Sequence, residues 1–151
     1  MDMHEFYMGN VFDAYDFFGA HPDDTGTVFR TFAPSAAGVC IIGEWTDWKE
    51  EPMQKNGQVY VYHSPAARKG MMYKYVIYSQ SGRMEHCDPY GFAMELRPAF
   101  SSIITDLMDY KFTDIKWMQK RNKNYDSPMN IYEVHLGSWV ENPDDENGWF
   151  T

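Results

Sequence analysis

The sequence predicts an all-β protein built around an antiparallel β-sandwich. Runs of about five to eight residues rich in Val, Ile, Phe and Tyr recur from residue 27 onward, and turn residues separate them. Two of the separators, Asn56-Gly57 and Ser81-Gly82, are dipeptides that favour tight hairpins. Short strands joined by such turns are typical of a sandwich, because parallel strands need long crossover connections.

The pattern of apolar runs places the individual strands. We expect strands near residues 27–33, 38–44, 58–63, 71–79, 84–87 and 102–106. Side chains alternate between the two faces of a strand, so Tyr73, Tyr75 and Ile77 share one face of the 71–79 strand. We expect these three to face the core, because Lys74 on the opposite face is most stable in solvent.

The segments before and after the predicted sandwich have other patterns. Apolar residues recur near helical spacing between Glu5 and Phe18, which predicts a short amphipathic helix ended by Gly19. Beyond about residue 107, a helical turn is expected over 114–124 and a strand over 131–136. The expected regions are an N-terminal helical segment, the sandwich, a linker and the start of a further unit, at 1–26, 27–107, 108–130 and 131–151.

Composition excludes several functions. The 151 residues include 22 acidic and 13 basic ones, a net charge of −9, so nucleic acid is not an expected partner. No apolar run approaches the roughly 20 residues of a membrane helix, and the N-terminus lacks a secretory signal pattern. With only Cys40 and Cys87, and no ligand spacing among the five His, we expect a cytoplasmic protein with no metal and no cofactor.

The candidate binding residues lie in the sequence GEWTDW (43–48), where Trp45 and Trp48 follow a predicted strand. A sugar ring has an apolar face that can stack on Trp, and its hydroxyl rim can bond to Lys. One interpretation is therefore a saccharide platform of one Trp with Lys74. The alternative, which the pattern alone favours, is that both Trp residues belong to the core. The sequence does not decide which of the two rings faces outward.

No arrangement of residues predicts catalysis. Carboxylates are abundant, but no motif places two of them as a glycoside-cleaving pair. A nucleophile elbow, a phosphate-binding loop and a catalytic Cys/His pair are all missing from the sequence. Asp88-Pro89 is interpreted as a simple turn. We therefore expect no catalytic residues in these 151 residues.

An ordered set of motifs resembles a known family. The set comprises YDFFGAH (15–21), FRTFAP (29–34), GEWTDW (43–48), YKY (73–75), DPY (88–90), ELRP (95–98) and YEVHLGSW (132–139). In this order the motifs are similar to the N-terminal part of a 1,4-α-glucan (glycogen) branching enzyme. Each motif alone is weak, whereas the ordered set is specific. HLGSW (135–139) points to branching enzymes rather than to debranching relatives such as isoamylase.

The resemblance implies a fold and a role. In that family an immunoglobulin-like sandwich, a carbohydrate-binding module of family 48, precedes a (β/α)₈ barrel of the α-amylase class. Residues 27–107 would then be the module, 108–130 the linker and 131–151 the first part of the barrel. The family's catalytic carboxylates lie far downstream, so none is assigned here. The fragment is expected to be inactive, and the parent enzyme to be a branching enzyme of glycogen biosynthesis.

The resemblance also implies a glucan-binding site. A related glycogen-binding module, in the β subunit of the AMP-activated protein kinase, stacks a glucan on a Trp and bonds it with a Lys. Trp48 and Lys74 match those two positions, and a second stacking position falls near Met84, where this chain has no Trp. The candidate carbohydrate-binding residues are therefore Trp48, Lys74, Trp45 and Met84.

Three functional hypotheses follow from the resemblance. The first is a non-catalytic fragment that binds α-glucan (glycogen or a maltooligosaccharide), supports the barrel of the same enzyme, or does both. The second is a purely structural sandwich without autonomous glucan binding. The third is a glycogen-targeting regulatory module, against which the YEVHLGSW segment (132–139) argues, because such a module has no barrel to begin. No hypothesis involves nucleic acid or a membrane.

Overall fold

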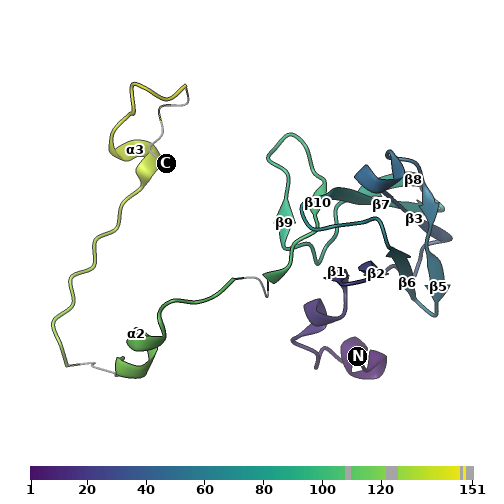
Figure 1. Cartoon of the computed structure of the whole chain (residues 1–151), viewed down its shortest axis with the longest axis horizontal. Helices are drawn as coiled ribbons and strands as arrows, with labels where there is room; N and C mark the ends of the chain where they lie inside the picture. Colours follow the sequence, from purple (N-terminus) through teal and green to yellow (C-terminus); the bar gives the residue numbers. More distant parts are fainter. Residues whose placement is uncertain (108–109, 122–125, 147, 149–151) are drawn as a thin grey trace. The chain divides into compact units, whose positions relative to one another are not determined.

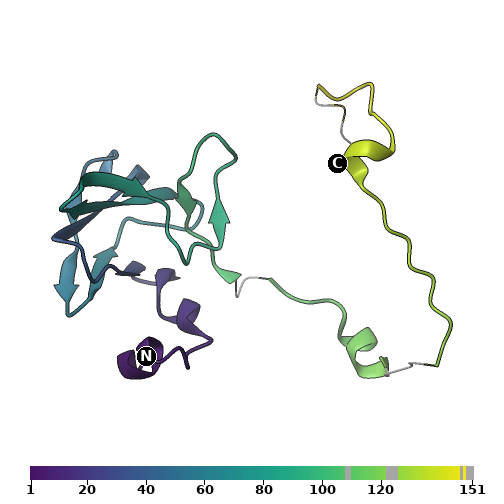
Figure 2. The same cartoon turned by 180° about the vertical axis from the view of Figure 1, so that it is seen from behind.

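The computed structural model describes residues 1–107, 110–121, 126–146 and 148. The chain divides into two compact units, Met1–Lys111 and Phe112–Thr151. The first unit contains all the strands of the described residues, and Figures 1 and 2 show them in two packed layers. The second unit contains only short helical turns and extended chain among its described residues.

All strand pairs in the first unit are antiparallel. The first sheet has the order β1-β2-β6-β5, formed by β1 (Gly19–Asp23), β2 (Gly26–Phe32), β6 (Val59–Ser64) and β5 (Gln54–Asn56). The second has the order β4-β3-β7-β10-β9, formed by β4 (Glu51–Pro52), β3 (Gly38–Gly43), β7 (Met72–Ser79), β10 (Ser102–Ile103) and β9 (Ala93–Met94). In addition, β8 (Gly82–His86) pairs with β7. The prediction of an all-β sandwich is confirmed.

The main core lies between the two sheets. Phe29 and Tyr60 of the first sheet are buried in one cluster with Ile41, Tyr73 and Tyr75 of the second. Tyr73 and Tyr75 therefore face the core as predicted, and Ile77 packs against the same cluster while partly exposed. The opposite face of β7 is not simply solvated, because Val76 on that face is also fully buried. Polar and aromatic side chains cover it, and they form the candidate site.

The predicted strands are all present, with shifted ends, and both predicted hairpins are confirmed. Asn56 pairs with Val59, and Ser79 pairs with Gly82. The structure adds β1, β4, β5 and β9, which the sequence pattern did not reveal. β1 begins at Gly19 and contains Pro22, which is tolerated because β1 is an edge strand of its sheet.

The single N-terminal helix predicted between Glu5 and Phe18 is wrong. The segment forms α1 (Met3–Tyr7) and a 3₁₀ turn, η1 (Ala14–Asp16). Gly9 ends α1, because its φ of 76° is left-handed and its N–H group donates to the Phe6 carbonyl oxygen. Phe6, Val11 and Phe18 of the segment instead join a second cluster, in which Phe18 packs with Val59 of β6.

In the second unit, one sequence prediction is confirmed and another is wrong. The helical turn is present as α2 (Ile115–Lys120). The strand predicted over 131–136 is wrong, because 131–135 form no strand and Leu136 begins α3 (Leu136–Trp139). A strand needs a neighbour for its N–H and C=O groups, and none is available among the described residues of this unit. No helix in the described residues is both long and apolar enough to span a membrane.

Candidate functional site

The loop that follows β3 sends its two Trp rings in different directions. The loop begins with a 3₁₀ turn, η2 (Glu44–Thr46). The Trp45 ring stacks on the buried Phe29 ring with centroids 5.1 Å apart and planes 20° apart, and packs against the main core. Gly43 permits this position, because any Cβ there would collide with the Trp45 ring. Trp45 is therefore a core residue, and its expected place in a sugar platform is corrected.

Trp48 is the ring that faces outward, and 41% of its surface is exposed. Asp47 and Trp48 have φ values of 51° and 59°, so two consecutive residues other than glycine adopt the left-handed region. The loop holds this conformation through bonds from the Trp48 N–H group to the Gly43 carbonyl oxygen (3.0 Å) and from the Thr46 hydroxyl group to the Lys49 carbonyl oxygen (2.8 Å). Such backbone strain is concentrated at functional sites.

Lys74 of β7 lies beside Trp48, as the resemblance implied. Its Nζ atom is 5.8 Å from the centroid of the Trp48 ring and 3.9 Å from that of Phe100. The same atom forms an ion pair of 3.4 Å with Glu85 Oε2, and only 18% of the Lys74 side chain is exposed. The ammonium group is thus held in place between two aromatic rings and a carboxylate. Sequence patterns did not identify Phe100, which reaches the site from the loop between β9 and β10.

A row of charged groups continues from Glu85 over the outer face of the second sheet. Arg83 of β8 donates to Glu85 Oε1 over 3.1 Å and to Glu50 Oε1 over 2.8 Å. The Tyr78 hydroxyl group donates to Glu50 Oε2 over 2.6 Å. The hydrogen bonds from Tyr78 and then Arg83 lower the pKa of Glu50. The row therefore fixes a carboxylate, a guanidinium and a second carboxylate beside the Lys74 ammonium.

The register of β8 keeps Met84 away from this group. Met84 pairs with Ile77, whereas Glu85 pairs with Val76. Directly paired residues share a face, and faces alternate along a strand, so Glu85 lies on the Lys74 face and Met84 on the other. The structure thus brings Trp48 and Lys74 together but does not bring Met84 to them. The expected stacking position at Met84 is corrected, and Phe100 supplies the nearby second ring.

A buried carboxylate anchors β7 beneath the site. Asp88 Oδ2 accepts hydrogen bonds from the hydroxyl groups of Tyr73 (2.6 Å) and Tyr75 (3.0 Å), and Oδ1 accepts one from the Tyr90 N–H group (2.8 Å). The Asp88 N–H group donates to Ser102 Oγ on β10 over 2.8 Å. Burial raises the pKa of Asp88 despite these bonds. The turn predicted at Asp88-Pro89 is therefore also a link between β7, β10 and the chain after β8.

The donor set of the described residues offers no metal centre. Among them, no group of three or more His, Cys, Asp and Glu is arranged to hold a metal ion. Cys40 and Cys87 are both free thiols. What the candidate site does offer is one exposed indole ring, a second exposed ring, a fixed ammonium group and ordered carboxylates. This combination suits a neutral, polyhydroxylated ligand with an apolar face.

Comparison with known proteins identifies a family for most of the sandwich. Residues 17–91 match the family Carbohydrate-binding module 48 (Isoamylase N-terminal domain). A 1,4-alpha-glucan branching enzyme GlgB of Fusobacterium nucleatum is 38% identical over 150 residues, which cover 95% of this chain and 24% of that protein. The GlgB of Francisella tularensis subsp. novicida is 40% identical over 152 residues, covering 91% of this chain and 24% of that protein.

Solved structures with a similar fold include PulA and other pullulanases. The maltotriose complex of PulA from Klebsiella pneumoniae aligns with a TM-score of 0.54 and 27% identity, over 64% of this chain and 12% of that one. A pullulanase from Anoxybacillus in complex with maltotetraose aligns with a TM-score of 0.58 over 83% of this chain and 17% of that one. The latter is 19% identical and shows the fold alone.

The sandwich and the family match define the class of this protein: it carries a carbohydrate-binding module of family 48. The relatives narrow the assignment, and the resemblance to the N-terminal part of a 1,4-alpha-glucan branching enzyme is confirmed. The chain spans about a quarter of the length of the curated relatives it matches.

Proposed function

We propose that the sandwich binds linear α-glucan at a platform made by Trp48 and Lys74, as a non-catalytic part of a branching enzyme. The observation that carries this proposal is the exposed Trp48 ring beside the fixed Lys74 ammonium. The membership of residues 17–91 in a carbohydrate-binding family supports it. The two residues lie on different segments, the loop after β3 and strand β7, and the fold holds them together.

The chemistry of the platform follows from its parts. The C–H face of a glucose ring stacks on the Trp48 indole, which provides apolar contact without fixing the direction of the hydroxyl groups. The Lys74 ammonium donates to the hydroxyl oxygens at the rim of that ring, and the Glu85 carboxylate accepts from hydroxyl hydrogens. Because Glu85 and Phe100 already hold Lys74, binding orders few additional side-chain torsions.

The role in the parent enzyme is also a proposal. The enzyme cleaves an α-1,4 bond, holds the released chain as a glucanyl ester and transfers it to a 6-hydroxyl group. The module keeps long glucans near the catalytic barrel, and the barrel is its second partner. The chain carries this supporting role and not the chemical step, and its cytoplasmic location stays a prediction.

A structural role without glucan binding is the second candidate. Exposed apolar side chains support it, notably Phe12 and Leu96, which are 89% and 91% exposed. Tyr15 and Phe92 also form an exposed ring pair with centroids 6.2 Å apart. These side chains fit a surface that supports another domain, and neither function excludes the other.

Titration of the full chain with maltoheptaose separates the two candidates. We expect saturable binding, which intrinsic Trp fluorescence follows. We expect Trp48→Ala to lose this binding. Phe12→Ala is the matched control, because it removes an exposed aromatic ring from the N-terminal segment and is expected to bind normally. Absence of binding by the unchanged chain up to millimolar ligand would leave only the structural role.

A further inference from the structure

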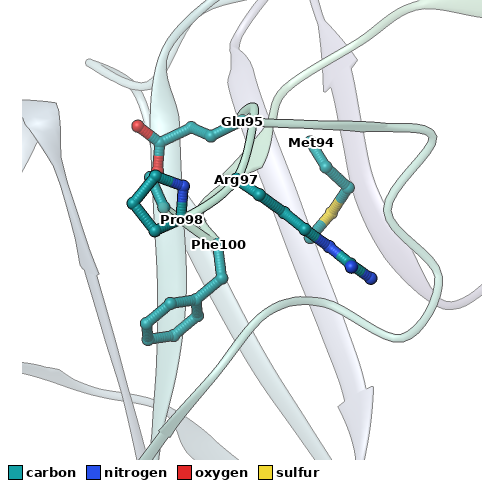
Figure 3. Close-up of a pocket in the computed structure, with 6 residues that line it drawn as sticks. Met94, Glu95, Arg97, Pro98 and Phe100 are labelled. Carbon is teal, nitrogen blue, oxygen red and sulfur yellow. The ribbon is translucent and has the colours of Figure 1, made fainter.

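Strand β8 is an open edge of the second sheet. It pairs with β7 on one side, and no strand of the described residues pairs with its outer side. β10 continues the same edge of β7 but is covered by β9, and the loop between those two strands folds around a hollow of its own, as Figure 3 shows. The open edge has no role in the function proposed above. An exposed strand edge is a template for pairing with another chain.

The register of β8 determines which backbone groups this edge presents. The Tyr78 carbonyl oxygen accepts a hydrogen bond of 2.8 Å from the Ala37 N–H group, which precedes β3, so the backbone groups of Tyr78 point away from β8. Tyr78 is paired with Arg83, so this pair is of the type without mutual hydrogen bonds, and the Arg83 N–H and C=O groups point to the open edge. Because the pattern alternates along the strand, Glu85 presents its own N–H and C=O groups there as well.

The sequence of β8 is complementary to a second copy of itself. When two β8 strands pair antiparallel about a twofold axis at Met84, Arg83 of each copy lies opposite Glu85 of the other. The residues with outward backbone groups then face each other, so each of the two pairs exchanges two backbone hydrogen bonds. Their side chains carry opposite charges on one face, which stabilises a cross-strand pair. Met84, which is 41% exposed, meets its own copy at the axis.

The charges of β8 favour this partner over others. Charged side chains on an edge normally hinder pairing with a foreign strand. Arg83 is already ordered, because it donates to Glu85 Oε1 over 3.1 Å and to Glu50 Oε1 over 2.8 Å. A second copy supplies a matched pair of charges twice, through the twofold axis, and the side chains need little further ordering to meet it.

We propose that β8 is a self-association surface, on which a second copy of this chain pairs edge to edge about a twofold axis at Met84. The second sheets of the two copies then form one continuous sheet. Because the axis is perpendicular to that sheet, both pairs of Trp48 and Lys74 lie on the same side of it. The contact is short, so the dimer is weak and forms only at high protein concentration. It does not depend on glucan binding.

Sedimentation velocity of the full chain tests the surface. The unchanged chain is expected to change from monomer to dimer between about 10 µM and about 1 mM, the range of weak complexes. Arg83→Glu should weaken this self-association by at least about tenfold, because it places like charges opposite each other twice in the dimer. Lys55→Glu is the matched control, because it makes the same change of charge on β5, the edge strand of the other sheet, and should associate as the unchanged chain does.

Mixing two charge variants tests the register. Glu85→Arg, like Arg83→Glu, should be monomeric alone. An equimolar mixture of the two should dimerise, because two acidic side chains on one strand then face two basic ones on the other. A mixture of folded variants that stays monomeric, or an Arg83→Glu variant that associates as the unchanged chain does, would place the contact on another strand and overturn the proposal.

Amide hydrogen exchange of the unchanged chain gives a readout that needs no variant. The Arg83 and Glu85 N–H groups should exchange slowly where the dimer forms and rapidly in dilute solution, because only pairing with a second copy protects them. Equal exchange of these two groups at both concentrations, or a chain that is still monomeric at about 1 mM, would also overturn the proposal.

Discussion

The Tyr73 hydroxyl group donates a hydrogen bond of 2.6 Å to Asp88 Oδ2, and both side chains are buried. Tyr75 donates to the same oxygen over 3.0 Å. Lys74 lies between these two residues on β7 and points to the opposite face. The buried carboxylate therefore fixes the backbone on both sides of Lys74, so the stability of the core and the position of the candidate site are linked.

This link predicts that Tyr73→Phe lowers the free energy of unfolding by an amount that depends on pH. Burial raises the pKa of Asp88 above its ordinary value of 3.8. The protonated Asp88 therefore stabilises the fold fully at pH values below 3.8, and this stabilisation is lost as the pH rises through the raised pKa. Removing the Tyr73 hydroxyl group raises this pKa further. We expect the unfolding free energy to fall by about 1.5–3 kcal/mol near neutral pH, and by less near about pH 4.

Urea unfolding at the two pH values measures this difference. Tyr62→Phe is the control, because within the described residues the Tyr62 hydroxyl group has no hydrogen-bond partner, although its ring packs against the same core. An equal loss of stability at both pH values in Tyr73→Phe would mean that the bond does not depend on the charge of Asp88.

The two Trp residues of the loop after β3 are predicted to differ in their effect on folding. Trp45→Ala should lower the unfolding free energy by about 3–5 kcal/mol, because it leaves a cavity against Phe29. Trp48→Ala should change it by less than about 1 kcal/mol, because the ring is largely a surface group. Chemical denaturation measures the unfolding free energy of both variants. Similar losses of unfolding free energy in the two would contradict the assignment of one ring to the core.

Backbone strain at Trp48 leads to a third prediction. With φ at 59°, a glycine at this position avoids a steric cost that Ala retains, about 1–2 kcal/mol. Trp48→Gly should therefore be more stable than Trp48→Ala, although both lose the stacking ring and bind no maltoheptaose. Thermal unfolding together with titration compares the two variants. Lower stability of the glycine variant would contradict the left-handed conformation.

The ion pair of Lys74 with Glu85 predicts a positioning role for Glu85. Glu85→Gln keeps the side-chain shape but removes the charge that holds the ammonium group, so maltoheptaose affinity should fall by about threefold to tenfold. Glu51→Gln, on exposed β4, is the matched control and should bind as the unchanged chain does. Unchanged affinity in Glu85→Gln would mean that Phe100 alone keeps Lys74 in place.

The sequence predicted those parts of the fold that depend on local pattern. Alternation along β7 correctly assigned Tyr73 and Tyr75 to the core, and turn dipeptides placed both hairpins. The prediction of one helix between Glu5 and Phe18 was wrong, because Gly9 stops α1 after few residues and positions such as Phe6 and Phe18 pack into a tertiary cluster instead. Edge strands as short as β4 and β9 carry too few residues to show a period.

The candidate site was predictable only in part. Trp48 and Lys74 could be identified through the resemblance. Which Trp faces outward depends instead on the left-handed conformation at Trp48 and on the space that Gly43 leaves for the Trp45 ring. Met84 was expected near the site, yet a shift of one residue along β8 moves a side chain to the other face. Phe100 was not among the candidate residues, because long-range folding, not local spacing, brings it to Lys74.

The most direct test of the central claim is to follow the Trp indole N–H signals of the full, ¹⁵N-labelled chain by NMR while maltoheptaose is added. The assignment comes from Trp48→Ala and from Lys74→Met, which removes the ammonium group beside the ring. We expect the Trp48 signal to shift progressively to saturation while the Trp45 signal, inside the core, stays in place. An unmoved Trp48 signal at saturating ligand, or a shift equally large at Trp45, would contradict a glucan platform on Trp48 and Lys74.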